Sequence, residues 1–211
     1  MVRPGIGGGE GSAALVRIAG RLARRGAERK PFATLVFLTD PVRTPDPAAF
    51  VARLPAGAAV IYRAFGAPDA EAVARTLRGL TRAADLRLLI GADERLAAMA
   101  RADGLHLPER MADLLPRLRA RHPGWILTAA AHSARAVRRA DRAGADAILL
   151  SAAFPSRSDS AGPPLGPLRF AALVRQARAP VLALGGVNAR TAPRLLTTGA
   201  AGFAGVGLWA D

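Results

Sequence analysis

Short apolar runs alternate with stretches of helical period from Ala33 onward, and this alternation constrains the fold more than any other feature. The apolar runs are typical of strands that are buried on both faces of a parallel sheet. They cover residues 34–39, 58–62, 86–90, 104–107, 125–129, 147–150, 181–184 and 202–206. The helical stretches between them include residues 68–82, 93–101, 110–121, 133–142, 167–177 and 188–197. Strand–helix alternation predicts an α/β fold with right-handed crossovers.

The number of strand–helix units favours a closed barrel over an open sheet. About eight units in roughly 175 residues fit a compact (β/α)8 TIM barrel better than a doubly wound sheet. No helix is expected after the last strand, since the sequence stops at Asp211. We therefore expect the amphipathic stretch 12–25 to take the place of the last outer helix. Residues 1–11, rich in glycine, are expected to form a flexible lead, and residues 12–211 a single domain.

Composition excludes several classes of protein. Hydrophobic residues make up 51% of the 211 residues, which excludes disorder as the main state. No apolar run reaches the length of a membrane helix. Cysteine is absent, which excludes disulfides, zinc–thiolate sites and thiol catalysis, and fits a cytoplasmic location.

The net charge of +14 comes almost entirely from arginine, and Lys30 is the only lysine. Aromatic residues make up only 5% of the chain, and the arginines are spread along helical stretches. This pattern favours solvated helix faces over a nucleic-acid surface, which usually interleaves basic and aromatic residues. A basic surface would steer phosphorylated small molecules toward the protein. The expected partner is such a ligand, with no nucleic acid and no membrane; a homodimer is left open.

Glycines stand where the last two strands end, and a TIM barrel places function at that end. Gly185 and Gly186 follow the seventh strand, and Val206 and Gly207 follow the eighth. Bare backbone amides can cradle a phosphate, and Asn188 is placed to cap the helix that follows. These positions predict a phosphate site; the alternative is that the glycines only relieve packing.

Two histidines also stand at strand ends. His132 follows the fifth strand, where a histidine could transfer protons near neutral pH, and Ser133 is placed to cap the next helix. A purely structural histidine is an equal alternative at His132 and at His106. The polar loop 151–164, which contains Arg157, suits a mobile lid over a phosphorylated ligand.

At these residues the chain resembles the thiamine phosphate synthase family and its close relative, the thiazole tautomerase family. The resemblance extends from about Leu35 to Leu208. The segments that carry it are Phe37-Leu-Thr-Asp40, Ala102-Asp-Gly-Leu-His-Leu107, Ala131-His-Ser133, Ala143-Gly-Ala-Asp146, Phe154-Pro-Ser156 and Ala183-Leu-Gly-Gly-Val187. It implies a TIM barrel that joins an aminopyrimidine diphosphate to a thiazole phosphate, with Mg²⁺ assisting the release of pyrophosphate.

The chain departs from the synthase pattern on the pyrophosphate side. Arg63 matches the family's Gln-x-Arg-x-Lys motif, but the Gln and the Lys are absent. Ala92 and Met111 stand where the family has its two metal-binding aspartates, so the Mg²⁺ ligands are not retained. Asp93 and Glu109 lie one or two positions away, where a substitute ligand could stand.

The thiazole phosphate side matches better. The resemblance implies phosphate or substrate contacts for Arg63, Phe154, Ser156, Arg157, Gly185, Gly186, Val206 and Gly207, and catalytic roles for His132 and Ser133. His132 matches the acid/base histidine of the tautomerases, whose reaction needs no pyrophosphate site. The resemblance leads us to expect a divergent transferase of the thiamine phosphate synthase type. The alternatives are a tautomerase-like isomerase that uses His132 and a non-catalytic protein that binds a phosphorylated ligand.

Overall fold

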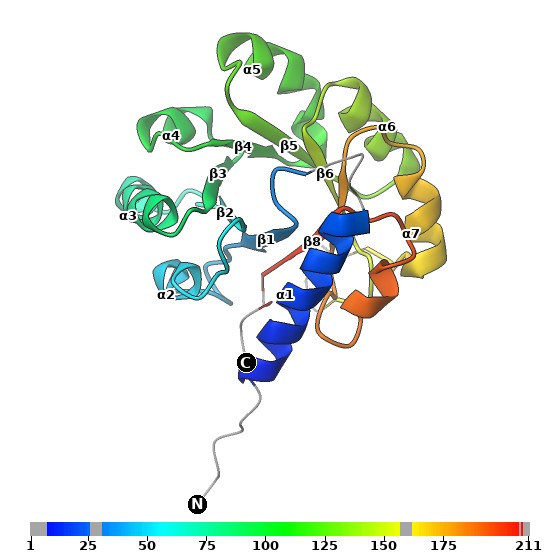
Figure 1. Cartoon of the computed structure of the whole chain (residues 1–211). Helices are drawn as coiled ribbons and strands as arrows, with labels where there is room; N and C mark the ends of the chain where they lie inside the picture. Colours follow the sequence, from blue (N-terminus) through cyan, green and yellow to red (C-terminus); the bar gives the residue numbers. More distant parts are fainter. Residues whose placement is uncertain (1–7, 26–30, 157–161, 207, 209–211) are drawn as a thin grey trace, which may run out of the picture.

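Eight parallel strands close into a barrel in the computed structural model, which describes residues 8–25, 31–156, 162–206 and 208 (Figure 1). The strands are β1 Leu35–Leu38, β2 Ala59–Tyr62, β3 Arg87–Gly91, β4 Gly104–Leu107, β5 Ile126–Ala131, β6 Ala147–Leu150, β7 Val181–Leu184 and β8 Gly202–Gly205. Each strand pairs with the next along the chain, and β8 pairs with β1. The predicted TIM barrel is confirmed, with a strand in every predicted apolar run.

Helices surround the barrel (Figure 1). They are α1 Gly8–Arg25, α2 Pro47–Val51, α3 Ala70–Ala83, α4 Glu94–Met99, α5 Leu115–Arg121, α6 Ala134–Arg142 and α7 Gly166–Val174, with the 3₁₀ helices η1 Glu109–Leu114 and η2 Ala192–Leu195. The stretch predicted as one helix over 110–121 is divided at Leu115, because Pro116 is tolerated only in the first turn of an α-helix. The helix predicted over 188–197 is reduced to η2, which is followed by Gly199 at a positive φ of 78°.

The helix α1 fills the place of a last outer helix, as predicted. It packs against β8 and η2, and Figure 1 shows it beside β8. Leu15, Ile18, Ala19 and Leu22 form its buried face. The helix begins at Gly8, four residues before the predicted start, and residues 1–7 of the predicted flexible lead lie outside the described residues. No helix in the described ranges is both long and apolar enough to cross a membrane.

Successive side chains along each strand point alternately into two hydrophobic cores. The larger core lies between the barrel and its helices, and the smaller one fills the barrel interior. The interior core contains Ala33, Val36, Leu38, Ala59, Ile61, Leu89, Ala147, Leu149, Leu182 and Ala204. His106 and Thr128 share the interior register with Gly91 and sit nearer the carboxyl ends of the strands. Apolar side chains therefore fill the middle of the barrel, and the polar side chains of His106 and Thr128 lie on the side of the mouth.

Candidate functional site

The mouth of the barrel, where the strands end at their carboxyl termini, gathers the described residues that the sequence singles out. Arg63 follows β2, His132 follows β5, Phe154 follows β6, and Gly185 follows β7. Because parallel strands of a closed barrel all end at the same face, these residues reach one rim from distant parts of the sequence. Arg157 and Gly207 lie outside the described residues.

Arg63 is held in a fixed position at this rim. Its Nε donates a hydrogen bond to the carbonyl oxygen of Thr39 at 2.7 Å, and its backbone N–H donates to Thr39 Oγ1 at 2.9 Å. The guanidinium also lies 3.5 Å from Asp40 Oδ2 and 5.1 Å from the centroid of the Phe65 ring. Its side chain is 25% exposed, so the cation is anchored by β1 and still reaches solvent.

The carboxylate of Asp40 stabilises the turn that follows β1. Burial opposes its ionisation, but hydrogen bonds from the backbone N–H groups of Arg43 and Val42, with the neighbouring guanidinium groups, lower the pKa of its carboxyl. The ionised carboxylate thus closes the turn 40–44 and helps to orient Arg63.

His106 forms a polar floor beneath the mouth. Its side chain is buried, and Nδ1 lies 2.9 Å from Thr128 Oγ1. Burial, aided by the positive charge of Arg63, lowers the pKa of His106 to about 3. The ring is therefore neutral at physiological pH, which suits hydrogen bonding better than acid catalysis there.

His132 is paired with a carboxylate. Glu109 Oε2 accepts hydrogen bonds from the backbone N–H of His132 and from its Nδ1, both at 2.8 Å. The His132 side chain is 46% exposed, so the ring is fixed on one side and open to solvent on the other. Ser133 Oγ accepts a hydrogen bond from Ala136 N at 3.1 Å and caps α6, as its position predicts. A catalytic role for Ser133 stays a prediction.

Sequence reasoning missed Glu109 as the partner of His132. The signal was topological: β4 and β5 are neighbours in the barrel, so residues that directly follow them lie side by side at the mouth. Glu109 comes two residues after β4 and His132 directly after β5. A carboxylate and a histidine at these two positions are placed to meet.

The backbone conformation after β7 favours glycine at positions 185 and 186. Both have positive φ angles, 86° and 65°, which non-glycine residues rarely adopt. A Cβ on Gly186 would lie 2.3 Å from the carbonyl oxygen of Pro155, in the loop that follows β6. Phe154 N donates to Gly185 O at 3.0 Å, so this loop packs directly on the glycine pair. The packing alternative thus has support, and phosphate binding there stays a prediction.

The other predicted contacts differ in their exposure. Phe154 is buried, 2% exposed, and its ring lies under the guanidinium of Arg194, 5.3 Å from the centroid. Val206 is partly buried and packs on the interior core below the mouth. Ser156 ends the described part of the loop after β6. Of these three, only Ser156 and Val206 have side chains with appreciable exposure at the rim.

The residues at the family's metal positions do not fit magnesium. Ala92 and Met111 supply no oxygen ligand from their side chains. Asp93 caps α4 by accepting from Leu96 N at 2.8 Å, and Glu109 is engaged with His132. Within the ranges that the structure describes, no three His, Asp or Glu side chains come together as a metal site would require.

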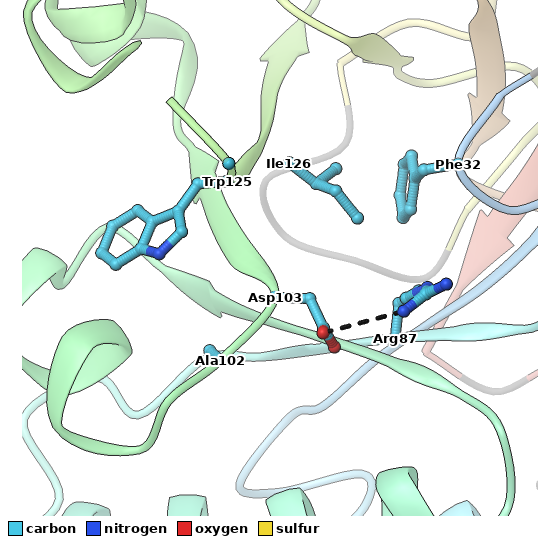
Figure 2. Close-up of a pocket in the computed structure, with 7 residues that line it drawn as sticks. Phe32, Arg87, Ala102, Asp103, Trp125 and Ile126 are labelled. Atoms are coloured by element: carbon cyan, nitrogen blue, oxygen red, sulfur yellow. Dashed lines mark ion pairs between the residues drawn. The ribbon is translucent and has the colours of Figure 1, made fainter. Parts of the chain in front are cut away.

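A cavity of about 500 Å³ lies at the opposite end of the barrel, where the strands begin (Figure 2). It is lined by Phe32, Arg87, Ala102, Asp103, Gly124, Trp125 and Ile126. Asp103 accepts hydrogen bonds from Leu88 N at 2.8 Å and from Arg78 Nη1 at 2.7 Å. Arg87 Nη1 lies 3.9 Å from Asp103 Oδ1, and Figure 2 marks this ion pair. The Asp103 carboxylate is therefore used to fix the start of β3, and this end of a TIM barrel serves stability.

Comparisons with known proteins agree with the resemblance in the sequence. A thiamine-phosphate synthase from Pyrococcus furiosus is 30% identical over 174 residues, which is 81% of this chain and 83% of that protein. Another from Geobacillus thermodenitrificans is 33% identical over 136 residues, covering 64% of this chain and 61% of that protein. The solved structure of a thiamine phosphate pyrophosphorylase from Pyrococcus furiosus superposes with a TM-score of 0.73 at 25% identity, covering 84% of this chain and 87% of that one.

The family model for thiamine monophosphate synthase matches residues 35–208, which include all eight strands. The match begins at the first residue of β1 and ends just after β8, so it takes in the barrel together with its mouth. On this evidence the chain belongs to the thiamine monophosphate synthase family.

Proposed function

We propose that this protein acts in thiamine biosynthesis as an acid–base isomerase of a thiazole phosphate, bound at the mouth of the barrel. The observation that carries the proposal is the half-exposed His132 ring, which Glu109 holds at the rim that also bears Gly185 and Gly186. Such a histidine is equipped to accept a proton and return it.

The reaction is a proton shift on a thiazole phosphate carboxylate. His132 Nε2 takes a proton from one carbon of the conjugated ring system, and the resulting imidazolium gives a proton back at another position. No atom is lost and no co-reactant is needed. The phosphate would be held by the backbone amides around Gly186, so that the ring meets His132 with little further ordering.

The pyrophosphate side of the mouth supports isomerisation over the synthase reaction. Pyrophosphate departs with several negative charges, which the family's magnesium and lysine neutralise as the bond breaks. Here Ala92 and Met111 replace the carboxylates, and Phe65 stands at the position of the lysine. Such losses cost about 3 kcal/mol of transition-state stabilisation for each group removed.

The synthase reaction itself is the second candidate. It is favoured by the names of the relatives, since the proteins from Pyrococcus furiosus and Geobacillus thermodenitrificans are both thiamine-phosphate synthases. The anchored guanidinium of Arg63 is the group that would contact the diphosphate. Formation of thiamine phosphate from both substrates, dependent on Mg²⁺, would support this candidate.

The test is a substitution at His132. Replacing His132→Asn removes the proton acceptor and should slow the isomerisation of a thiazole phosphate carboxylate by about 10² to 10⁴-fold. His122→Asn is the matched control, because His122 lies at the opposite end of the barrel, paired with Glu94 and stacked on Trp125. Its turnover should equal that of the wild type. Unchanged turnover in His132→Asn would contradict the proposal.

A further inference from the structure

We propose that Glu109 is a positioning residue that fixes His132 as the Nδ1–H tautomer and presents its Nε2 to the substrate. This inference rests on the proposed function, because it names the group that prepares the same histidine for proton transfer. Glu109 itself does not touch the reacting atoms.

The hydrogen-bond geometry sets the tautomer. An ionised carboxylate has only acceptor sites, so the Nδ1 that lies 2.8 Å from Glu109 Oε2 must carry a proton. The same oxygen accepts from the backbone N–H of His132, also at 2.8 Å. A neutral imidazole then has its lone pair on Nε2. Within the described residues Nε2 has no hydrogen-bond partner, and the side chain is 46% exposed.

The surrounding elements hold the two residues together. Glu109 begins η1, and α6 starts two residues after His132. Arg139 of α6 donates from Nε to Asp113 Oδ1 at 2.7 Å and from Nη2 to the carbonyl oxygen of Arg110 at 3.5 Å. These contacts tie η1 to α6, so the carboxylate and the ring are carried by two elements braced against each other.

The pairing prepares His132 for both halves of the reaction. While the ring is neutral, Glu109 selects the tautomer that can accept a proton at Nε2. When the proton has been taken, the carboxylate faces the imidazolium and stabilises its charge, which is the role of the buried aspartate in serine protease triads. The carboxylate partners of metal-bound histidines, which orient the ring in the same way, contribute about 10 to 100-fold to activity.

Nitrogen-15 NMR of histidine-labelled protein reads the tautomer without any substrate. The wild type should show His132 as Nδ1–H, and Glu109→Ala should shift it toward the Nε2–H form that the free histidine side chain favours. Glu94→Ala is the matched control, because Glu94 pairs with His122 and should change only the His122 signals. An Nε2–H form in the wild type, or an unchanged signal in Glu109→Ala, would overturn the inference.

Kinetics separate this inference from the proposed function. Glu109→Ala should lower kcat for the thiazole phosphate carboxylate by about 10 to 100-fold with KM little changed, since the residue orients the ring and does not bind substrate. Glu109→Gln keeps an acceptor oxygen and should recover part of the loss. If the wild type shows the Nδ1–H tautomer but no turnover, the role of Glu109 is supported and the proposed function fails.

Discussion

Gly186 shows at the scale of one residue how closely the loops at the mouth pack. Its φ of 65° disfavours a side chain, and the carbonyl oxygen of Pro155, 2.3 Å from where a Cβ would lie, leaves no room for one. The residue lets the loop after β6 lie directly on the end of β7. A negatively charged substitution there would disturb folding as well as any anion site, so stability must be measured beside binding.

Replacing Gly186→Ala should lower the free energy of unfolding by at least about 3 kcal/mol, because backbone strain and overpacking add. Gly66→Ala is the control, since Gly66 has a φ of 80° but open space around it. Strain alone should cost that variant about 1 kcal/mol. Urea denaturation measures both, and equal losses would show that contact with Pro155 is unimportant.

His106 makes stability depend on pH. Its pKa is about 3 in the folded protein against 6.5 in the unfolded chain, so below pH 6.5 the unfolded state binds more protons. Above pH 6.5 His106 is neutral in both states and does not lower the free energy of unfolding. As the pH falls from 6.5 toward 3, protonation of His106 in the unfolded chain lowers that free energy progressively. Between pH 7 and pH 5 the loss from this residue should be about 2 kcal/mol.

The variant His106→Asn tests this assignment, because its amide can still bond to Thr128 but does not titrate. Denaturation midpoints at pH 7 and pH 5 should differ less in the variant than in the wild type. An equal pH dependence in both proteins would show that His106 is not the responsible group.

At the scale of elements, the strands and most helices could be predicted from the sequence, whereas η2 was predicted too long and α2 was missed. Runs such as Leu35–Leu38 are apolar throughout because both faces are buried, which leaves a clear signal. The segment 188–197 has helical period but is η2 over only four residues, and α2 was not predicted at all. Such short turns depend on Asx and Pro geometry and on tertiary contacts more than on periodicity.

The candidate site could be predicted from the sequence only in part. Position at a strand end identified His132, Arg63 and Gly186, because a barrel brings all strand ends to one face. The pairing of Glu109 with His132 depends on where the backbone of η1 runs, which periodicity does not report. The neutral state of His106 likewise depends on its burial beside Arg63.

The helix α1 is an integral part of the fold, and its buried face tests this. Leu22 is 1% exposed and packs into the main core. Leu22→Ala should lower the free energy of unfolding by about 2 to 5 kcal/mol, through lost burial and the cavity it leaves. Val16 on the same helix is 39% exposed, and Val16→Ala should cost about 0.5 kcal/mol or less. Equal effects in thermal or urea denaturation would mean that α1 is only loosely attached.

At the scale of the whole molecule, the two ends of the barrel differ in how their charged side chains are used. At the end where the strands begin, Asp103 and Asp146 each accept from the first residues of a neighbouring strand and pair with an arginine from an outer helix. At the mouth, Arg63 and His132 keep exposed surface. Two of the arginines behind the +14 charge, Arg78 and Arg119, therefore fasten outer helices to the barrel.

The central claim is that the mouth moves protons on a thiazole phosphate and needs no metal. The most direct measurement is deuterium exchange into a thiazole phosphate carboxylate, followed by NMR in D2O with EDTA present. The wild type should catalyse exchange and isomerisation under these conditions, and His132→Asn should not. A wild-type protein that catalyses neither deuterium exchange nor isomerisation in EDTA would contradict this claim. Formation of thiamine phosphate by the same protein, once Mg²⁺ and an aminopyrimidine diphosphate are supplied, would then assign it the synthase reaction.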